Sequence, residues 1–411
     1  MPTPSTIQRT YLVLTTVTTL ATSFIWGVNT LFLLDAGLSN TEAFAANAFY
    51  AIGQVLFEVP TGVVADTRGR RFSYLLGAAT LLVSTALYLV MWQIHAPFIG
   101  WALASALLGL GFTFFSGATE AWLVDALAAT GFSGQLDTVF GRAQTASGAA
   151  MLIGSVAGGI VAQVADLGVP YILRAGMLGV TLVIAYRFMH DVGFTPRHGA
   201  DPVTEVRNVV RGSIDAGWRN PPVRALMLAA PFSSGVGFFA FYASQPYLLQ
   251  LYGDPDAYSV AGLAAALFAA AQILGGILVP YARRLFRRRT DAVLIGTVAS
   301  VGIFLVIGVT DSFVLALVLL AGWALVFAVE GPLRQAFING IIPSEQRATV
   351  LSFDSFMGSI GGAVAQPALG RVSDVYGYGP AYLVAGAVQT LAIPFVILAR
   401  RQQAASDPIT A

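Results

Sequence analysis

The sequence predicts an all-α membrane protein with twelve transmembrane helices in two pseudo-symmetric bundles of six. Three observations support this prediction: the apolar composition, a regular succession of apolar runs, and a weak internal repeat. Of the 411 residues, 56% are hydrophobic and only 10% are charged, whereas soluble domains carry roughly 25% charged residues. A water-soluble protein of this composition has too few polar side chains to cover its surface. A water-soluble enzyme is therefore excluded.

Twelve apolar runs follow one another along the chain, separated by short segments that contain charges, glycine or proline. Each is close to the ~20 residues that an α-helix needs to cross the hydrocarbon core. The fourth, fifth, tenth and eleventh runs also contain charged residues. The runs cover approximately residues 11–34, 42–64, 72–93, 98–126, 138–164, 169–190, 224–250, 257–281, 291–309, 313–340, 348–370 and 378–399.

The arginines predict the orientation of these helices. All 22 basic residues are arginine, and those between the runs fall mainly on alternate connections, beginning with Arg9 and the Arg68, Arg70 and Arg71 cluster. The remaining connections are mostly acidic. Because basic connections stay in the cytoplasm, we expect both termini on the cytoplasmic side of a bacterial inner membrane. The first run lacks a small-residue cleavage site, so we expect a retained helix rather than a signal peptide.

Residues 191–223 interrupt the apolar pattern and separate an amino-terminal bundle (residues 1–190) from a carboxyl-terminal bundle (residues 224–411). Within this linker, apolar residues recur at every fourth position beside a stripe of charged ones. This pattern favours an amphipathic helix on the inner membrane surface, with an unstructured tether as the alternative. The apolar positions are Val206, Val210, Ile214 and Trp218.

The two halves resemble each other when they are aligned with an offset of 210 residues. This offset pairs Gly176 with Gly386, and Glu120 with Glu330. Two repeated six-helix bundles are typical of secondary transporters, in which a central site opens alternately to either side of the membrane.

The connection between the second and third runs carries the most specific motif, Gly62-Val-Val-Ala-Asp66-Thr-Arg-Gly69-Arg70-Arg71. It resembles the signature of the major facilitator superfamily at this place, and the resemblance extends over the whole chain through the number of runs, the repeat and the linker. The resemblance implies the major facilitator fold. It also implies that this connection is a latch that holds the two halves while the substrate cavity faces outward.

The chemistry of the motif is compatible with a latch. Gly62 allows another helix to approach closely, and Asp66 is suited to face the positive amino end of a neighbouring helix. Arg71 is suited to anchor in lipid headgroups, and we expect Arg70 to pair with Asp125 at the end of the fourth run. The alternative is a simple basic turn that serves orientation alone.

The fifth run contains Gly154-Ser155-Val-Ala-Gly158-Gly159, which resembles the glycine-rich signature of drug/proton antiporters in the same superfamily. Serine stands where that signature has proline, and Ala150 stands where it has its leading glycine. The alternative is ordinary helix packing, for which small residues at this spacing are expected.

Charged residues inside apolar runs are candidates for function, because each costs at least ~2.5–3.5 kcal/mol at a helix centre. Glu120 has no opposite charge at helical spacing, so we predict that it exchanges protons or holds a cationic substrate. Asp354 and Glu58 are the next candidates. The alternatives are fixed ion pairs, of Glu120 with Arg142 and of Asp354 with Arg334. Glu330 and Arg334 lie four residues apart and are predicted to neutralise each other in a structural pair, with a gate as the alternative.

The resemblance implies that the first, fourth, seventh and tenth runs line a central cavity. These runs offer mainly aromatic side chains and few amides or hydroxyls, which favours a lipophilic or amphipathic substrate over a sugar. The alternative for the aromatic residues is packing or lipid contact. The candidate lining residues are Trp26, Asn29, Phe115, Phe238, Tyr242, Gln245, Trp323 and Phe327.

Together these features predict a secondary transporter, not an enzyme, that exports hydrophobic or weakly cationic small molecules against a proton gradient by alternating access. The alternatives are a nutrient or metabolite symporter or uniporter, and a translocase for lipid-linked metabolites. There is no cysteine, and no metal-binding or nucleotide-binding motif, so we expect no cofactor and no metal. The expected partners are a small-molecule substrate, protons and membrane lipid, without nucleic acid, and the expected state is a monomer.

Overall fold

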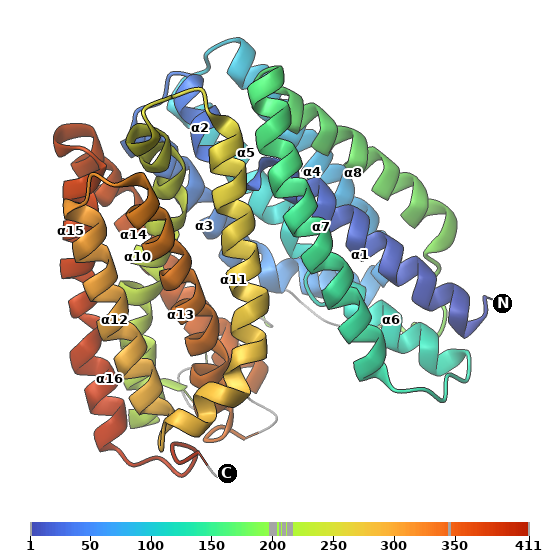
Figure 1. The fold of residues 1–411 in the computed structure, drawn as a ribbon. Coiled ribbons are helices and arrows are strands. Elements are labelled where there is room, and N and C mark those ends of the chain that lie inside the picture. Colours follow the sequence, from blue (N-terminus) through green and yellow to red (C-terminus); the bar gives the residue numbers. More distant parts are fainter. Residues whose placement is uncertain are drawn as a thin grey trace. The chain divides into compact units, whose positions relative to one another are not determined.

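The computed structural model describes residues 2–196, 204, 207, 211, 217–343 and 347–409. Within them, the first half of the chain forms α1 (Pro4–Trp26), α2 (Asn29–Asp35), α3 (Asn40–Arg68), α4 (Arg70–Gln93), α5 (Phe98–Thr113), α6 (Ala118–Ala129), α7 (Leu136–Val164) and α8 (Val169–Phe188). The second half forms α10 (Pro221–Tyr252), α11 (Tyr258–Leu285), α12 (Arg289–Val309), α13 (Phe313–Asn339), α14 (Arg347–Tyr376), α15 (Tyr378–Thr390) and α16 (Ala392–Arg401) (Figure 1).

The helices coincide with the predicted runs. Over the described residues, ten helical segments are long and apolar enough to cross a membrane, and the pair α1 and α2, bent by 47°, raises this number to eleven. The fourth run is broken into α5 and α6 near Gly117, which has a φ of +67° that side chains disfavour. The eleventh predicted run is the 30-residue helix α14, which is not among these apolar segments. The all-helical membrane fold is therefore confirmed.

The described structure consists of two compact units. Unit 1 contains residues 1–37, 49–206 and 256–266, and unit 2 contains residues 38–48, 207–255 and 267–411. Most of α3 thus belongs to unit 1 and most of α11 to unit 2, while the first residues of each helix belong to the other unit. The predicted amphipathic positions Val206, Val210 and Ile214 lie outside the described residues.

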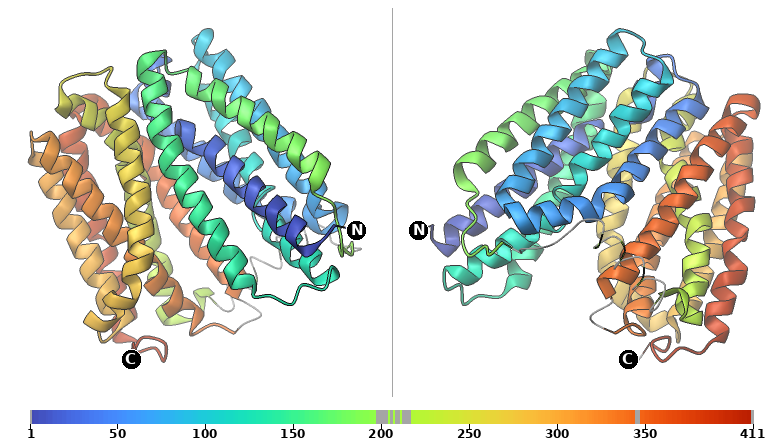
Figure 2. Two further views of the ribbon diagram at one scale, coloured as in Figure 1. Left: turned by 45° about the vertical axis from the view of Figure 1, so that its right-hand side comes forward. Right: turned by 180° about the vertical axis from the view of Figure 1, so that it is seen from behind.

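Unit 1 is organised around α1, which packs against α7 and α8, while α4 packs against α5 and α8 (Figures 1 and 2). The glycines of the fifth run make the first of these contacts. A Cβ atom on Gly158 would overlap the carbonyl oxygen of Phe24, and one on Gly154 would overlap the side chain of Ser23. The helix-packing interpretation of this glycine motif therefore holds, since α7 approaches α1 with backbone against backbone.

Unit 2 repeats the same arrangement. Helix α10 packs against α14, α15 and α16, while α12 packs against α13 and α15. Glycine again sets the closest approach, because a Cβ atom on Gly361 of α14 would overlap the backbone of Pro231 in α10. Runs one and five in unit 1 thus pair as runs seven and eleven do in unit 2. This equivalence supports the internal repeat that the sequence predicts.

The start of α3 is held in unit 2 by Asp374. The carboxylate accepts hydrogen bonds from the N–H of Asn40 (2.8 Å), the N–H of Thr41 (3.0 Å) and the hydroxyl of Thr41 (2.5 Å). Burial raises the pKa of Asp374, but the hydrogen bonds from Thr41 and Asn40 lower it by a larger amount. The pKa of Asp374 therefore lies below its ordinary value. Asp374 therefore caps the amino end of a helix to which it is remote in sequence.

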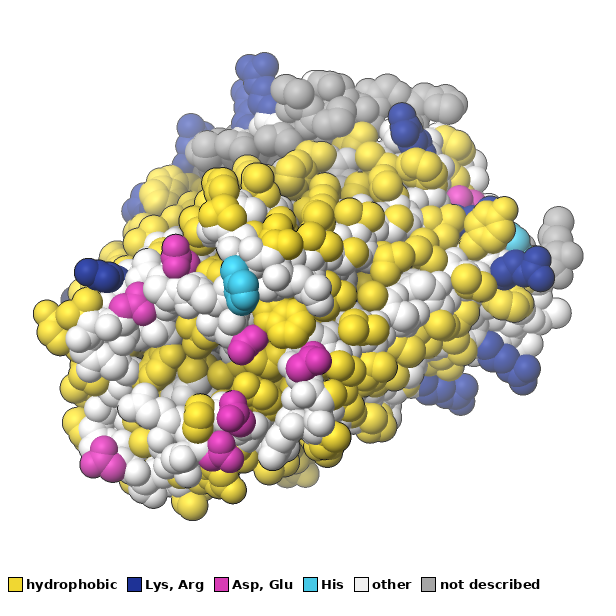
Figure 3. All heavy atoms as spheres, turned by 90° about the horizontal axis from the view of Figure 1, so that it is seen from above, with side chains coloured by type: hydrophobic (Ala, Val, Ile, Leu, Met, Phe, Trp, Pro, Cys, Tyr) yellow, Lys and Arg dark blue, Asp and Glu magenta, His cyan; other side chains and the backbone are white. Residues whose placement is uncertain are grey.

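Many large apolar side chains remain exposed in both units, including Leu56, Ile153 and Val164 in unit 1 and Leu285 and Val364 in unit 2. On the face drawn in Figure 3, hydrophobic side chains are abundant at the surface and acidic side chains gather in one region. Exposed apolar surface of this extent is unfavourable in water and matches a lipid environment.

Candidate functional site

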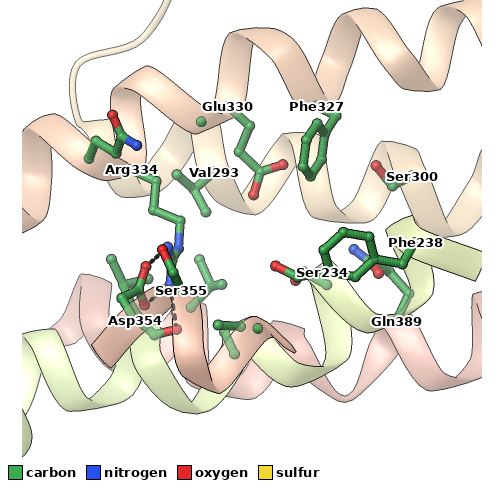
Figure 4. Close-up of a pocket in the computed structure, with 18 of the residues that line it drawn as sticks. Ser234, Phe238, Val293, Ser300, Phe327, Glu330, Arg334, Asp354, Ser355 and Gln389 are labelled. Atoms are coloured by element: carbon green, nitrogen blue, oxygen red, sulfur yellow. Dashed lines mark hydrogen bonds and ion pairs between the residues drawn. The ribbon is translucent and has the colours of Figure 1, made fainter. Parts of the chain in front are cut away.

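A cavity of about 350 Å³ lies inside unit 2, among helices α10, α12, α13 and α14 and the ends of α15 and α16. Helices α10, α13 and α14 each present one face to it. On α13 the face consists of Trp323, Phe327, Glu330 and Arg334, spaced four, three and four residues apart as an α-helix requires. Figure 4 shows Glu330 and Phe327 projecting from one side toward Ser234 and Phe238 on the other.

An ion pair between Arg334 and Asp354 closes one end of the cavity. Arg334 Nη1 pairs with Asp354 Oδ2, and Nη2 donates to Asp354 Oδ1 at 2.6 Å and to the carbonyl oxygen of Leu226 at 3.0 Å. A two-point guanidinium–carboxylate pair fixes both side chains in one geometry. Of the two partners predicted for Arg334, Asp354 therefore makes the close contact, across from α13 to α14.

Glu330 lies one helical turn from Arg334 and is coupled to it through electrostatic attraction. Its one hydrogen bond among the described residues joins Oε1 to Thr297 Oγ1 at 3.5 Å. The hydroxyl of Thr297 also donates to the carbonyl oxygen of Val293 at the shorter distance of 2.9 Å. A hydroxyl has one hydrogen to donate, so the Thr297 oxygen keeps a lone pair that faces the carboxyl group.

Glycine makes room for this carboxyl group. A Cβ atom on Gly296 of α12 would lie 2.9 Å from Glu330 Oε2. The Glu330 side chain therefore rests directly on the α12 backbone, at a place where any larger residue would displace it.

Hydroxyl and amide groups complete the lining. Ser234, Ser300 and Gln389 contribute to it (Figure 4), together with Ser233, Ser355, Ser359 and Gln335. The Oε1 atom of Gln389 is buried and has no hydrogen-bond partner in the described structure. This cavity is more polar than the sequence predicted, because serines of α10, α12 and α14 and glutamines of α13 and α15 also line it.

Three of the predicted cavity residues line this cavity: Phe238, Trp323 and Phe327. The Trp323 ring also packs against Phe304, with ring centroids 5.5 Å apart. Gln245 lies farther along α10 and is buried. Tyr242 is half-buried, with its ring against Phe241.

The remaining predicted residues lie in unit 1. Asn29 is buried and accepts a hydrogen bond from Tyr171 Oη at 2.9 Å, and Phe115 packs edge-on against Tyr74. Trp26 is half-buried at the end of α1. These contacts indicate a packing role for Asn29 and Phe115.

The predicted acidic candidates of unit 1 are exposed. Glu120 lies in the first turn of α6, and Glu58 accepts a hydrogen bond from Ser116 Oγ at 2.6 Å. Arg142, the alternative ion-pair partner of Glu120, is also exposed on α7. Within the described part of unit 1 Glu120 is thus exposed, whereas Glu330, its counterpart in the repeat, is half-buried in unit 2.

The predicted latch residues form a polar cluster at the end of unit 1 where α3 passes into α4. Arg70 pairs with Asp66 at 2.5 Å, and its Nε lies 3.9 Å from Asp125 Oδ2, which is the partner that the sequence predicted. These residues line a cavity of about 340 Å³ together with Phe194 and Thr195. No atom lies within 4 Å of a Cβ built on Gly62 in the described structure, and the close helix approach expected there stays a prediction.

Asp191 is a member of this cluster that the sequence did not indicate. Its Oδ1 accepts the N–H of Arg71 at 2.8 Å, and it lies against Gly69, which precedes α4 with a φ of +108°. A side chain on Gly69 would overlap Asp191. Gly69 is thus required for its conformation and for the close approach of the capping carboxylate.

The comparisons with known proteins agree with this fold. Among solved structures, the chain is similar to the nucleoside transporter NupG, with a TM-score of 0.81, 11% identity, and coverage of 95% of this chain and 98% of that one. A D-xylose-proton symporter gives a TM-score of 0.68 at 15% identity, covering 96% of both chains.

The human organic anion transporter MFSD10 gives a TM-score of 0.60 at 14% identity, covering 96% of this chain and all of that one. At such identities the likeness establishes the fold alone. No match was found among curated proteins. The family model described as Major Facilitator Superfamily matches residues 11–366. With its helical repeats and its charged cavity, the chain belongs to the Major Facilitator Superfamily and is a membrane transporter of the secondary type, not an enzyme.

Proposed function

We propose that the protein is a proton-coupled exporter of small, weakly cationic amphipathic molecules, which bind in the unit 2 cavity, and that Glu330 carries the proton. The observation that supports this proposal is that the two carboxylates of the cavity differ in how firmly they are bound by neighbouring side chains. Asp354 is bound at two points by Arg334, whereas Glu330 faces the cavity with a single 3.5 Å hydrogen bond. Glu330 is therefore the acid that is available to bind a proton or a cationic substrate in turn.

The environment of Glu330 offers a partner to each protonation state. Ionised, the carboxylate is attracted by Arg334 and accepts hydrogen bonds from a substrate in the cavity. Protonated, it donates to the free lone pair of Thr297 Oγ1. A cationic substrate and a proton thus compete for one group. This competition supplies the differential binding that an exchange mechanism requires.

The cavity also indicates the class of substrate. Phe238 and Phe327 offer aromatic faces to an apolar or cationic group. The unpartnered Gln389 Oε1 and the Glu330 carboxylate are both acceptors, so they favour a molecule that carries N–H or O–H donors. Glu120 stays a second candidate for proton exchange, with less support because it is exposed.

A second candidate function is uptake of a polar metabolite by proton symport. The observation that favours it is the set of serine and glutamine side chains around the cavity, which suits hydroxyl-rich substrates. This function uses the same carboxylate and reverses the direction of net transport.

The proposal has three further parts, which concern the latch, the membrane location and the oligomeric state. We propose that the cluster of Asp66, Arg70 and Asp125 acts as the latch between the two halves, which are residues 1–190 and 224–411. The alternating arginines support a bacterial inner membrane location with both termini in the cytoplasm. The protein is proposed to work as a monomer.

Transport in proteoliposomes with an imposed pH gradient tests the function. Three probes separate the candidates: ethidium, an aromatic cation with N–H donors, and radiolabelled uridine and D-xylose. We expect ethidium to accumulate on the acidic side, with little movement of the other two. Accumulation of uridine or xylose on the alkaline side would establish symport and reject the exporter. Transport that does not depend on the imposed pH gradient would reject proton coupling.

A further inference from the structure

An apolar groove of about 610 Å³ runs along the surface of unit 1. Helix α4 contributes Phe72, Leu75, Leu76 and Ala79 to it, and α8 contributes Leu182, Val183, Tyr186 and Arg187. Large side chains in it are open to the surroundings, with Val183 and Tyr186 more than 60% exposed. The two helices therefore leave an open apolar groove between them.

Arginines gather at one end of this groove. Arg187 lines the groove itself. The Arg71 guanidinium lies 5.1 Å from the centre of the Tyr186 ring and donates to the Tyr186 carbonyl oxygen at 2.6 Å. The Arg68 guanidinium lies 5.6 Å from the centre of the Phe72 ring. Two positive charges thus lie over aromatic residues of the groove, and a third, Arg187, lines it.

Among the described residues, no ion pair joins Arg68, Arg71 or Arg187 to an acid. Asp191 accepts the backbone N–H of Arg71 at the start of α4 and forms no ion pair with its guanidinium. The Nε of Arg71 is buried without a hydrogen-bond partner in the described structure. Arg68 and Arg187 are exposed. A ligand with a negative charge at one end would therefore find donors here.

We propose that this groove is a binding site for one anionic phospholipid, with an acyl chain between α4 and α8 and the phosphate between Arg68 and Arg187. A hydrocarbon tail suits the aliphatic and aromatic walls, and guanidinium groups suit phosphate oxygens. All three arginines lie at helix ends: Arg68 is the last residue of α3, Arg71 is the second residue of α4, and Arg187 is the last but one of α8. The charge at the end of the groove favours an anionic lipid over a zwitterionic one.

Lipid retention by the purified full-length chain tests the proposal. Native mass spectrometry after titration with phosphatidylglycerol, in parallel with phosphatidylcholine, measures the affinity of the wild-type protein for each. We expect tighter retention of phosphatidylglycerol. The double substitution Arg68→Ala with Arg187→Ala should weaken it by about 25-fold, because each arginine near an anionic lipid surface contributes about a factor of five.

Two further variants separate the groove from general charge effects. Arg283→Ala with Arg401→Ala removes two exposed arginines of unit 2 and should leave retention unchanged. Ala79→Phe fills the groove without changing charge and should weaken retention of both lipids. Equal affinity for the two lipids, or the same loss in the unit 2 control, would overturn the proposal. Unchanged retention in Ala79→Phe, accompanied by loss of a dimer, would assign the groove to a second copy of the chain.

Discussion

Asp354 and Glu330 should respond in opposite ways to neutralisation, although both are carboxylates in one cavity. Asp354→Asn removes one charge from the two-point pair with Arg334, and leaves a half-buried guanidinium with only the longer-range attraction of Glu330. Removing one partner of a buried pair costs about 3–5 kcal/mol. Because 20% of the Arg334 side chain and 10% of the Asp354 side chain are exposed, and asparagine retains one acceptor, we expect about 3 kcal/mol.

Glu330→Gln removes a charge that has one 3.5 Å hydrogen bond. Glutamine fills the same volume and offers an N–H donor to Thr297, so the expected loss is below about 1 kcal/mol. At about 2–4 °C per kcal/mol for a domain of 150–250 residues, Asp354→Asn should lower the apparent Tm by about 6–12 °C. Glu330→Gln should lower it by less than about 4 °C.

The assay is thermal unfolding of both variants in one detergent at one heating rate, since membrane proteins often unfold irreversibly. The double substitution Arg334→Met with Asp354→Leu is the control, because apolar replacement of both partners restores stability in other buried pairs. If Glu330→Gln lowered the Tm as much as Asp354→Asn, both acids would be structural. The assignment of different roles to them would then be refuted.

Two further predictions concern the helix contacts. Asp374→Ala should destabilise the protein by about 0.5–2 kcal/mol through loss of capping at α3. Because the folded-state pKa of Asp374 is depressed, this stabilisation is full above the unfolded pKa of ~3.9 and disappears as the pH falls through the folded value. The Tm values of wild type and variant should therefore converge at acidic pH. A Tm difference that does not change with pH would contradict this prediction. Gly158→Ala should be severely destabilising because its Cβ would overlap the backbone of α1, whereas Gly176→Ala meets open space and should be tolerated or stabilising; equal Tm values for the two would contradict the packing.

The fold was largely predictable because apolar length and arginine placement are properties of single segments. The hydrocarbon thickness dictates each run, and the basic connections dictate which ends lie together. The breaks are different in kind. The bend between α1 and α2 and the break at Gly117 depend on how neighbouring helices pack, so the run lengths gave no indication of them.

The candidate site was predictable in its charged residues and not in their pairing. Spacing of four residues placed Glu330 and Arg334 on one face of α13, but Arg334 reaches across to Asp354 on α14. The distance between two helices depends on small residues far from the pair, such as Gly361, where α10 and α14 meet. Ser300 and Gln389 gave no signal, because single neutral polar residues hardly change the hydropathy of a run.

The central claim is that Glu330 carries the proton exchanged for substrate. Proteoliposomes that contain a trapped pH indicator test it directly: ethidium is added outside, and the change in internal pH is recorded for the wild-type protein and for Glu330→Gln. We predict that ethidium entry drives protons out of wild-type vesicles, and that addition of ethidium causes no pH change in vesicles that contain the variant. Proton movement of undiminished size in the variant would contradict the claim.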